Sequence, residues 1–390
     1  MYGRGTSDDK GPAVAALYAM KAVRDLGFEL DKDVRLILGS DEECGSSDIA
    51  YYFGKNTHAP MTISPELIFL LVFLEKGSLH TTFTAEVSLE EGLPRVRSAV
   101  SGIKVNVVPA KADAVVEGMT ADEMNKYVKE AEDETGVKFT VSLAEDGALM
   151  IHADGVSAHA ASPMDGNNAL TALLKLLSSL PLAESKTKTL LHNVTTLFPH
   201  GDYCGGGLGV NLEDEFRKDT LTLDLFELND TKMSGTFDCR ACNSATEENT
   251  KNVVQKKLSD AGFEPNDSPL NPPHYVPKDS ELVKTLLETY TDVTGEVREP
   301  LAIGGGTYVH HIENGVACGC ADPSVDNHMH GPDEFVIIDQ LVMSAEIFAL
   351  AIVKLCGKMK KKWKKGRPFT NRLKVWTKIE HIYRLLCRHS

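Results

Sequence analysis

Runs of apolar residues with two different spacings alternate along the first part of the chain. Residues 12–26 open with a proline and repeat apolar side chains at helical spacing, which predicts an amphipathic helix that ends at Gly27. The short apolar run at residues 34–38 predicts a buried strand. A helical stretch at residues 46–54 and an apolar run at residues 67–74 continue the alternation. This order of helices and strands is typical of a doubly wound α/β sheet.

The pattern changes after the apolar run and returns in the last third of the chain. In between lie short strand-like runs, turns and two helical stretches, at residues 122–134 and 169–180. A helical pattern over residues 279–291, with Asp279 as its predicted N-cap, then precedes a strand near residues 316–320 and a long apolar helix over residues 336–355. Because the first pattern resumes, we expect the two ends of the chain to form one discontinuous domain.

We therefore predict an α/β doubly wound domain built from residues 1–77 and 274–356, interrupted by an inserted α+β domain over residues 78–273. Residues 357–390 form a separate basic tail, with twelve Lys or Arg against one Glu, while the whole chain has a net charge of −15. The strongly acidic remainder argues against a nucleic-acid partner. The tail is interpreted either as a solvated extension or as a segment that binds an anionic surface.

Length and composition are those of a globular protein. The chain has 390 residues, of which 42% are hydrophobic. Its longest uncharged apolar run is far shorter than the roughly 20 residues of a membrane helix, and Met1 does not open a signal-peptide pattern. We therefore expect a cytoplasmic protein that does not bind a membrane. Its eight cysteines are interpreted as reduced, mostly buried thiols.

Two groups of carboxylates stand at the predicted ends of elements. Asp8-Asp9 precedes the first helix, and Asp41-Glu42-Glu43 follows the predicted strand at residues 34–38. Crowded carboxylates repel one another unless protons or cations neutralise them, and a divalent metal does so while also activating water. From spacing alone, either metal binding or ordinary capping and turn roles explains these residues. The run His328-Met329-His330 has the same two interpretations.

Taken together, five ordered motifs resemble the di-zinc peptidase family that contains aminoacylase, carboxypeptidase G and carnosinase. Within that family they are most similar to the bacterial dipeptidase branch of PepV, and the likeness extends from residue 1 to about residue 356. The motifs are Tyr2-Gly3-Arg4-Gly5-Thr6-Ser7-Asp8-Asp9-Lys10-Gly11-Pro12, Asp41-Glu42-Glu43, Gly155-Val156-Ser157-Ala158-His159 with Pro163 and Asn168-Ala169, Ile303-Gly304-Gly305-Gly306-Thr307-Tyr308, and Met329-His330.

The resemblance implies a metal-dependent hydrolase with two Zn²⁺ ions in the family, of which one is well supported here. Asp8 matches the carboxylate that bridges both ions, and Glu43 and His330 match the remaining ligands of one of them; Zn²⁺ accepts this mixed oxygen and nitrogen ligation. Glu42 matches the general base, which takes a proton from the attacking water without binding metal. The implied substrate is a small peptide with a free carboxylate.

Two residues of the inserted domain also match family positions. His159 matches a histidine that donates a hydrogen bond to the developing oxyanion. Arg240 matches an arginine that holds the terminal carboxylate of the substrate, although a proline that follows it in the family is absent here. A large inserted domain in this branch implies a monomer.

The sequence departs from the family at the second metal position. The family has a His-x-Asp segment upstream of the Gly-Arg-Gly motif, and it has no counterpart in the sequence given. The family's other ligand of that ion is an aspartate, and this chain has Glu66 in the matching segment Ser64-Pro65-Glu66. We therefore expect an incomplete second site, in which Glu66 is the candidate ligand, and impaired activity. The basic tail matches nothing in the family.

Three functions follow from the resemblance. The first is a dipeptidase that cleaves the amide bond of dipeptides. The second is an N-acyl amino acid deacylase, which uses the same metal chemistry. The third is an inactive peptide-binding relative that binds one zinc or none. Metal stoichiometry distinguishes it from the first function, and a panel of acyl amino acids and dipeptides distinguishes the first from the second.

Overall fold

The structure is a computed structural model that describes residues 1–66, 71–88, 92–215, 218–322 and 324–358. The chain divides into two compact units. Unit 1 comprises Met1–Glu75 together with His274–Ser390, and unit 2 comprises Lys76–Pro273. The predicted discontinuous α/β domain with an inserted α+β domain is therefore confirmed as a fold class. Except for residues 357 and 358, the predicted basic tail lies outside the described residues.

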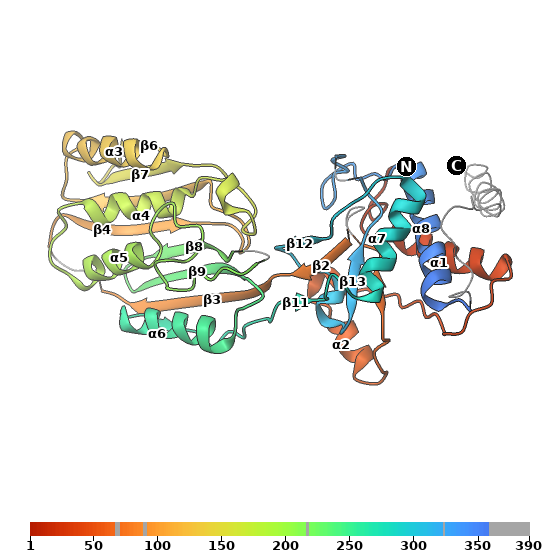
Figure 1. The fold of residues 1–390 in the computed structure, drawn as a ribbon. Helices are drawn as coiled ribbons and strands as arrows, with labels where there is room; N and C mark the ends of the chain where they lie inside the picture. Colours follow the sequence, from red (N-terminus) through yellow and green to blue (C-terminus); the bar gives the residue numbers. More distant parts are fainter. Residues whose placement is uncertain (67–70, 89–91, 216–217, 323, 359–390) are drawn as a thin grey trace. The chain divides into compact units, whose positions relative to one another are not determined.

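Unit 1 contains a five-stranded mixed sheet with helices packed around it (Figure 1). The strand order is β1-β13-β2-β11, with β12 paired to β2; β1 is parallel to β13, and β12 is parallel to β2. An apolar cluster that includes Ala19 and Phe348 joins the first and last helices of the unit. The elements of unit 1 are α1 (Lys10–Asp25), η1 (Glu42–Cys44), α2 (Ser47–Phe53), β1 (Thr62–Ser64), β2 (Leu71–Glu75), β11 (His274–Tyr275), α7 (Glu281–Thr294), β12 (Leu301–Ile303), η4 (Tyr308–His311), β13 (Gly315–Cys318) and α8 (Ile338–Cys356).

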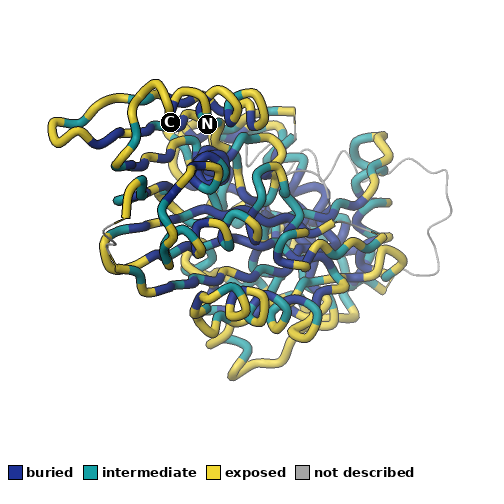
Figure 2. Tube along the Cα trace, turned by 90° about the vertical axis from the view of Figure 1, so that its left-hand side faces the viewer, coloured by how far each residue is buried: buried dark blue, intermediate teal, exposed yellow. Residues whose placement is uncertain are grey.

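Unit 2 is an eight-stranded antiparallel sheet with four helices, α3 to α6, against one face (Figure 1). The strand order is β10-β3-β9-β8-β4-β5-β7-β6. Buried residues, dark blue in Figure 2, follow the strands and the helix sides that face them. The elements of unit 2 are β3 (Gly77–Glu86), β4 (Arg95–Ser101), β5 (Lys111–Glu117), α3 (Ala121–Thr135), β6 (Lys138–Leu143), β7 (Leu149–Asp154), η2 (Pro163–Asp165), α4 (Ala169–Ser179), α5 (Lys186–Leu197), β8 (Thr220–Leu228), β9 (Lys232–Ala241), η3 (Glu247–Lys251), α6 (Asn252–Asp260) and β10 (Glu264–Pro265).

Most predicted elements are present with shifted ends, but two predictions are wrong. The predicted strand at residues 34–38 pairs with no other described strand and is irregular, and the side chain of Leu38 is exposed. Apolar residues alone do not make a strand without a neighbour to pair with. The N-cap of α7 is Ser280, whose side chain accepts a hydrogen bond from Val283 N, and not Asp279. Of the predicted run at residues 67–74, the first four residues lie outside the described ranges.

Within the described ranges, no helix combines the length and the apolar character that a membrane crossing requires.

Candidate metal centre and substrate-binding residues

Three segments of unit 1 that are far apart in the sequence bring Asp8, Glu43 and His330 together. Asp8 lies in the turn before α1, Glu43 lies in the short helix η1, and His330 lies in the loop before α8. The Nε2 atom of His330 is 2.9 Å from Asp8 Oδ2 and 2.9 Å from Glu43 Oε1. Among the described residues, these three form the single group of potential metal ligands, with ligand atoms within 4.8 Å of one another.

The donor set fits a divalent cation. Two carboxylate oxygens and one imidazole nitrogen are ligands that Zn²⁺ accepts, and three protein ligands leave a position for water or substrate. Burial lowers the pKa of His330, but its contacts with Asp8 and Glu43 outweigh that effect and raise the pKa above its ordinary value. The imidazole nitrogen therefore lies where the two carboxylates attract positive charge.

Glu42 is next to this group and is half-buried. Burial raises the pKa of Glu42 to about 7, and the charges on Glu43 and Asp8 act in the same direction. A carboxylate with this pKa exchanges protons near neutral pH, which is the property that a general base requires.

Asp9 and Glu66 are two further acids near Asp8. Burial raises the pKa of Asp9 to about 8, with the charge on Glu66 as the next cause. Burial also raises the pKa of Glu66 to about 7, although a hydrogen bond from Ser64 opposes this. The buried Oδ1 atom of Asp9 has no hydrogen-bond partner in the described part of the chain. Glu66 thus lies within electrostatic range of the predicted site but outside the group formed by Asp8, Glu43 and His330.

A polar network from the glycine-rich motif holds the segment that carries Glu42 and Glu43. The Tyr308 hydroxyl donates to Asp48 Oδ2 at 2.9 Å and accepts from Asp41 N at 3.1 Å. Asp48 Oδ2 also accepts from Ser40 N at 2.7 Å. These contacts fix the backbone just before Glu42. Tyr308 was predictable from the sequence through its motif, whereas Asp48 was not, because it looks like an ordinary acid near the start of a short helix.

Glu75, at the end of β2, is another buried acid, and it was not predicted from the sequence. It accepts hydrogen bonds from Thr307 Oγ1 at 2.7 Å and Thr307 N at 3.2 Å, and its Oε2 atom is 3.0 Å from His310 Nδ1. Glu75 is fully buried. It therefore ties the end of the glycine-rich loop to the sheet, and its position in an apolar strand was the available signal, because a buried charge requires partners.

The other two predicted site residues, His159 and Arg240, lie in unit 2. Arg240 is on β9, and its guanidinium contacts Asp238 through two atoms, with Nε to Oδ1 at 2.7 Å and Nη2 to Oδ2 at 2.8 Å. His80 Nε2 is 3.3 Å from Asp238 Oδ2. His159 lies in the loop after β7, and burial followed by the positive charge of Arg240 lowers the pKa of the imidazole.

Two further polar residues of unit 2, Asn106 and Asp224, are joined by a hydrogen bond. Asn106 lies beside His159, since Ala160 N donates to Asn106 O and Val107 pairs with His159. Asn106 N donates to Asp224 Oδ2 at 2.9 Å, and burial raises the pKa of Asp224 to about 8. Asn106 has a φ of 75°, a left-handed conformation that asparagine tolerates better than most residues. Neither residue carries a spacing signal, so neither was predicted from the sequence.

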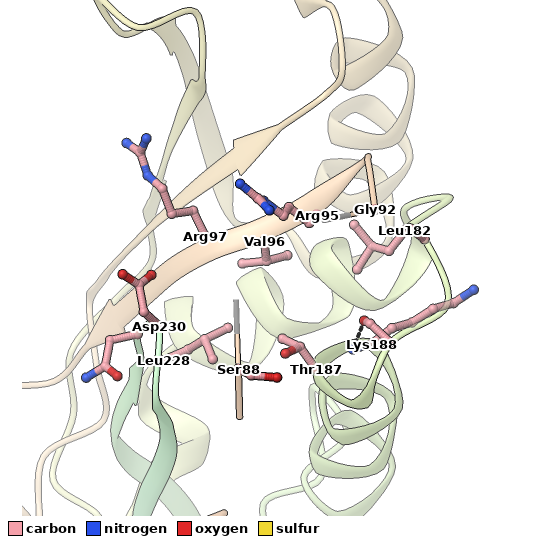
Figure 3. Close-up of a pocket in the computed structure, with 13 residues that line it drawn as sticks. Ser88, Gly92, Arg95, Val96, Arg97, Leu182, Thr187, Lys188, Leu228 and Asp230 are labelled. Atoms are coloured by element: carbon pink, nitrogen blue, oxygen red, sulfur yellow. Dashed lines mark hydrogen bonds between the residues drawn. The ribbon is translucent and has the colours of Figure 1, made fainter. Parts of the chain in front are cut away.

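A separate hollow in unit 2 contains none of the predicted site residues (Figure 3). It lies beside β4 and the start of α5, and Arg95, Arg97 and Lys188 contribute basic side chains. Arg95 and Arg97 are both paired with Glu117. The hollow is therefore separate from the group formed by Asp8, Glu43 and His330.

Comparison with known proteins places the chain in a family. Residues 1–354 match the model of peptidase family M20/M25/M40. A Bacillus subtilis (strain 168) protein named "Putative dipeptidase YtjP" is 33% identical over 359 residues, an alignment that covers 91% of this chain and 76% of that protein. The Beta-Ala-Xaa dipeptidase of Lactobacillus delbrueckii subsp. lactis is 28% identical over 365 residues, covering 91% and 75%.

A solved structure supports the fold. The aminopeptidase PepT from Bacillus cereus ATCC 10987 aligns with a TM-score of 0.50 at 11% identity, over 89% of this chain and 71% of that chain. At this identity the likeness concerns the fold alone. The family match over residues 1–354, together with the 33% identity to the Bacillus subtilis protein, shows that the chain belongs to peptidase family M20/M25/M40 and is a metallopeptidase of that family.

Proposed function

We propose that this chain is a zinc-dependent dipeptidase. The observation that carries the proposal is the convergence of Asp8, Glu43 and His330, whose ligand atoms lie within 4.8 Å of one another, beside the half-buried Glu42. The two relatives reported above are both named as dipeptidases, and one name specifies β-alanyl dipeptides. A small peptide is therefore the substrate class that we propose.

In this proposal, Asp8, Glu43 and His330 would hold a Zn²⁺ ion, and Glu66 is the candidate protein ligand of a second ion. When bound, zinc polarises the scissile carbonyl and makes water a better nucleophile at neutral pH. Glu66 is buried, and its negative charge is one of the causes that raise the pKa of Asp9. This supports its placement beside the acidic residues of the site. The expected incomplete second site and reduced activity stay predictions.

Glu42 accepts a proton at its carboxylate as water attacks and returns it to the leaving amine. Its raised pKa supports both transfers, because an acid with a pKa near 7 is present in both protonation states at neutral pH. The hydrogen bonds around Asp41 and Asp48 keep the backbone before Glu42 in place. Correct placement of a reacting group accounts for a large part of enzymatic rate enhancement.

We further propose that His159 donates a hydrogen bond to the oxyanion and that Arg240 binds the terminal carboxylate of the substrate. The lowered pKa of His159 supports a neutral imidazole, which can donate from one ring nitrogen. Asp238 holds the guanidinium by Nε and Nη2, so that its orientation is set before substrate arrives. A monomer is the expected assembly.

The test measures zinc content and hydrolysis on the full chain. Because one ligand group is found among the described residues, we expect about one tightly held zinc per chain after dialysis against a weak chelator. We also expect hydrolysis of β-alanyl-histidine. His330→Gln should lose both zinc and activity, whereas His58→Gln, which changes an exposed histidine of the same unit, should retain both.

Other outcomes distinguish the alternatives. Zinc that is retained by His330→Gln would contradict the proposed ligand set. Hydrolysis of N-acetyl amino acids without hydrolysis of any dipeptide would indicate the deacylase. Bound zinc and peptide without turnover would indicate the inactive binding protein.

A further inference from the structure

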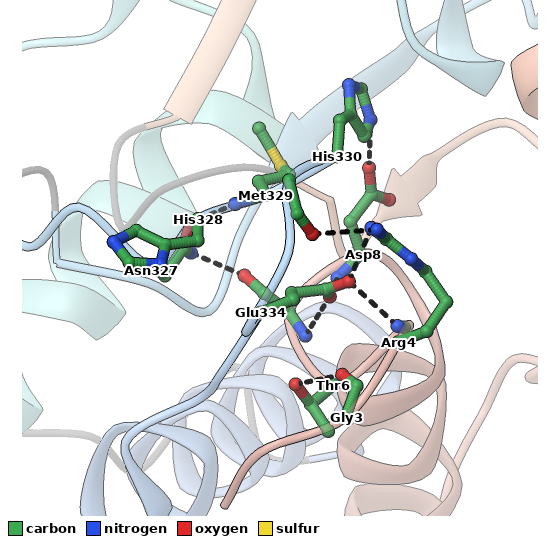
Figure 4. A network of polar contacts seen from close by, with 12 residues as sticks. Gly3, Arg4, Thr6, Asp8, Asn327, His328, Met329, His330 and Glu334 are labelled. Atoms are coloured by element: carbon green, nitrogen blue, oxygen red, sulfur yellow. Dashed lines mark hydrogen bonds and ion pairs between the residues drawn. The ribbon is translucent and has the colours of Figure 1, made fainter.

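One buried carboxylate outside the predicted site lies on the segment that carries His330 and contacts the segment that carries Asp8. Glu334 lies four positions after His330, and its side chain is 1% exposed. Its Oε1 atom accepts from Ser7 N at 2.9 Å and Asp8 N at 3.0 Å. Its Oε2 atom accepts from Gly5 N and Arg4 Nη1, each at 2.9 Å (Figure 4). Each carboxylate oxygen thus holds two donors of the turn that ends at Asp8.

We infer that Glu334 is a positioning residue that fixes Asp8 and His330 relative to each other for cation binding. This inference rests on the proposed zinc site. Glu334 does not contact the cation in this proposal; it acts through the backbone N–H of Asp8 and through the loop that it shares with His330.

The carboxylate replaces the hydrogen bonds that the turn cannot make within itself. Backbone N–H groups that are buried without partners are costly, and hydrogen bonds to a charged acceptor are stronger than neutral ones. Burial alone would raise the pKa of Glu334, but the hydrogen bonds from Gly5, Asp8 and Ser7 hold it below its ordinary value. Four donors, three backbone N–H groups and the Arg4 guanidinium, thus converge on the Glu334 carboxylate.

Glu334 connects the turn that ends at Asp8 to the loop that carries His330. Its residues His328, His330 and Asp333 have φ values of 57°, 63° and 59°, in the left-handed region that non-glycine residues rarely adopt. Such a backbone persists when surrounding contacts determine it. Arg4 supplies one such contact, because it donates to Glu334 through Nη1 and to Gly331 O through Nη2 at 2.7 Å.

Further contacts join the turn that ends at Asp8 to the loop that carries His330. Asn327 Nδ2 donates to Ser7 Oγ, and Gly3 N donates to Glu334 O at 2.8 Å. Tyr2 pairs with Phe335 in an antiparallel bridge. The two segments are thus joined by backbone pairing, and the Glu334 carboxylate adds the contact that reaches the Asp8 peptide itself.

The experiment compares zinc affinity in Glu334→Gln and Asp219→Asn, both made in the full chain. Gln has nearly the same shape, but its amide NH₂ would face two donors in place of an acceptor oxygen. Asp219 is a matched control, because it is a fully buried carboxylate that accepts from Leu212 N at 3.1 Å and Cys242 N at 2.7 Å in unit 2. Competition with a chromogenic chelator measures the zinc Kd, and melting in EDTA measures the stability of the metal-free protein.

We expect Glu334→Gln to weaken zinc binding about 10-fold to 100-fold, as is typical of residues that orient metal ligands. Asp219→Asn should lower the melting temperature in EDTA without changing the zinc Kd. A folded Glu334→Gln protein with the zinc Kd of the parent would overturn the inference. If that variant does not fold, Arg4→Met provides the same test, since the Arg4 side chain is 58% exposed.

Arg4→Met should weaken zinc binding while the metal-free melting temperature stays unchanged, and an unchanged zinc Kd in this variant would overturn the inference. Failure of the proposed zinc site is distinguishable. In that case His330→Gln would bind zinc like the parent chain, whereas failure of the inference alone leaves His330→Gln impaired and Glu334→Gln normal.

Discussion

The two units position their candidate site residues in different ways. In unit 2, Arg240 lies on β9, which pairs along its length with β3 and β8 over one large apolar core that includes Leu173. In unit 1, Asp8 and His330 lie on irregular backbone, in the turn before α1 and in the loop before α8. Buried carboxylates such as Glu334 hold that backbone by hydrogen bonds.

Packing and polar contacts therefore have separate tasks in this protein. A strand in a packed sheet has its register and side-chain directions set by ladder pairing and by burial of one face. An irregular turn has no such register, so each of its N–H groups needs an individual partner. We therefore expect core substitutions in unit 2 to change stability and polar substitutions in unit 1 to change chemistry.

The largest expected effect is that of Glu42→Gln. Removing a general base lowers kcat by about 10²-fold to 10⁴-fold. Zinc content should stay unchanged, because Glu42 is not among the grouped ligands. Glu288→Gln, at an exposed position on α7, is the matched control and should retain kcat. Loss of zinc from Glu42→Gln would show that Glu42 is a ligand and would remove the distinction between it and Glu43.

The next effect is one of packing in unit 2. Leu173 is fully buried on α4, so Leu173→Ala should lower the free energy of unfolding by about 2–5 kcal/mol, measured by urea denaturation. The zinc Kd should not change. Leu143→Ala, at a side chain that is 70% exposed, should leave stability nearly unaltered. A weakened zinc Kd in Leu173→Ala would break the proposed separation of the two units' tasks.

A smaller effect is expected from Asp238→Asn, which tests the polar contact that unit 2 uses. Asn offers one acceptor oxygen, so the two-atom contact with Arg240 is lost and KM should rise about tenfold, with kcat less affected. Asp113→Asn is the control, since Asp113 pairs with His152 at 2.6 Å on another part of the same sheet. An equal fall in kcat with unchanged KM would contradict a role in holding substrate.

The last expected effect concerns the pH dependence of stability. Burial raises the pKa of Asp224 to about 8 from its ordinary value near 3.8, so between these values the folded protein keeps a proton that the unfolded chain has lost. Stability contributed by this group is complete at low pH and falls by about 1.4 kcal/mol per pH unit through that window.

Asp224→Asn removes this dependence, so its melting temperature should exceed that of the parent increasingly from pH 5 to pH 7.5. Asp230→Asn, at an exposed position, should follow the parent at every pH. Parallel pH profiles for Asp224→Asn and the parent would show that Asp224 is charged in the folded protein.

Local patterns in the sequence were sufficient for much of the fold. Helical spacing predicted α3 and α4 within a few residues, because a helix buries one stripe of side chains whatever its partners are. The prediction of a strand at residues 34–38 was wrong for the complementary reason, since a strand forms only when it pairs with a neighbouring strand. Motif order also singled out Asp8, Glu43 and His330, which the structure brings together.

The sequence by itself determined the chemical character of the candidate site: acids beside a histidine, at the ends of elements, in an order typical of the family. Only the tertiary structure decided what holds those residues. Glu334 is 326 positions from Asp8, and Glu75 is 232 positions from Thr307, so no local spacing could pair them. A buried carboxylate is stable only with its donors in place, and those donors are backbone N–H groups that every residue except proline carries. Their identity is therefore a property of the folded chain.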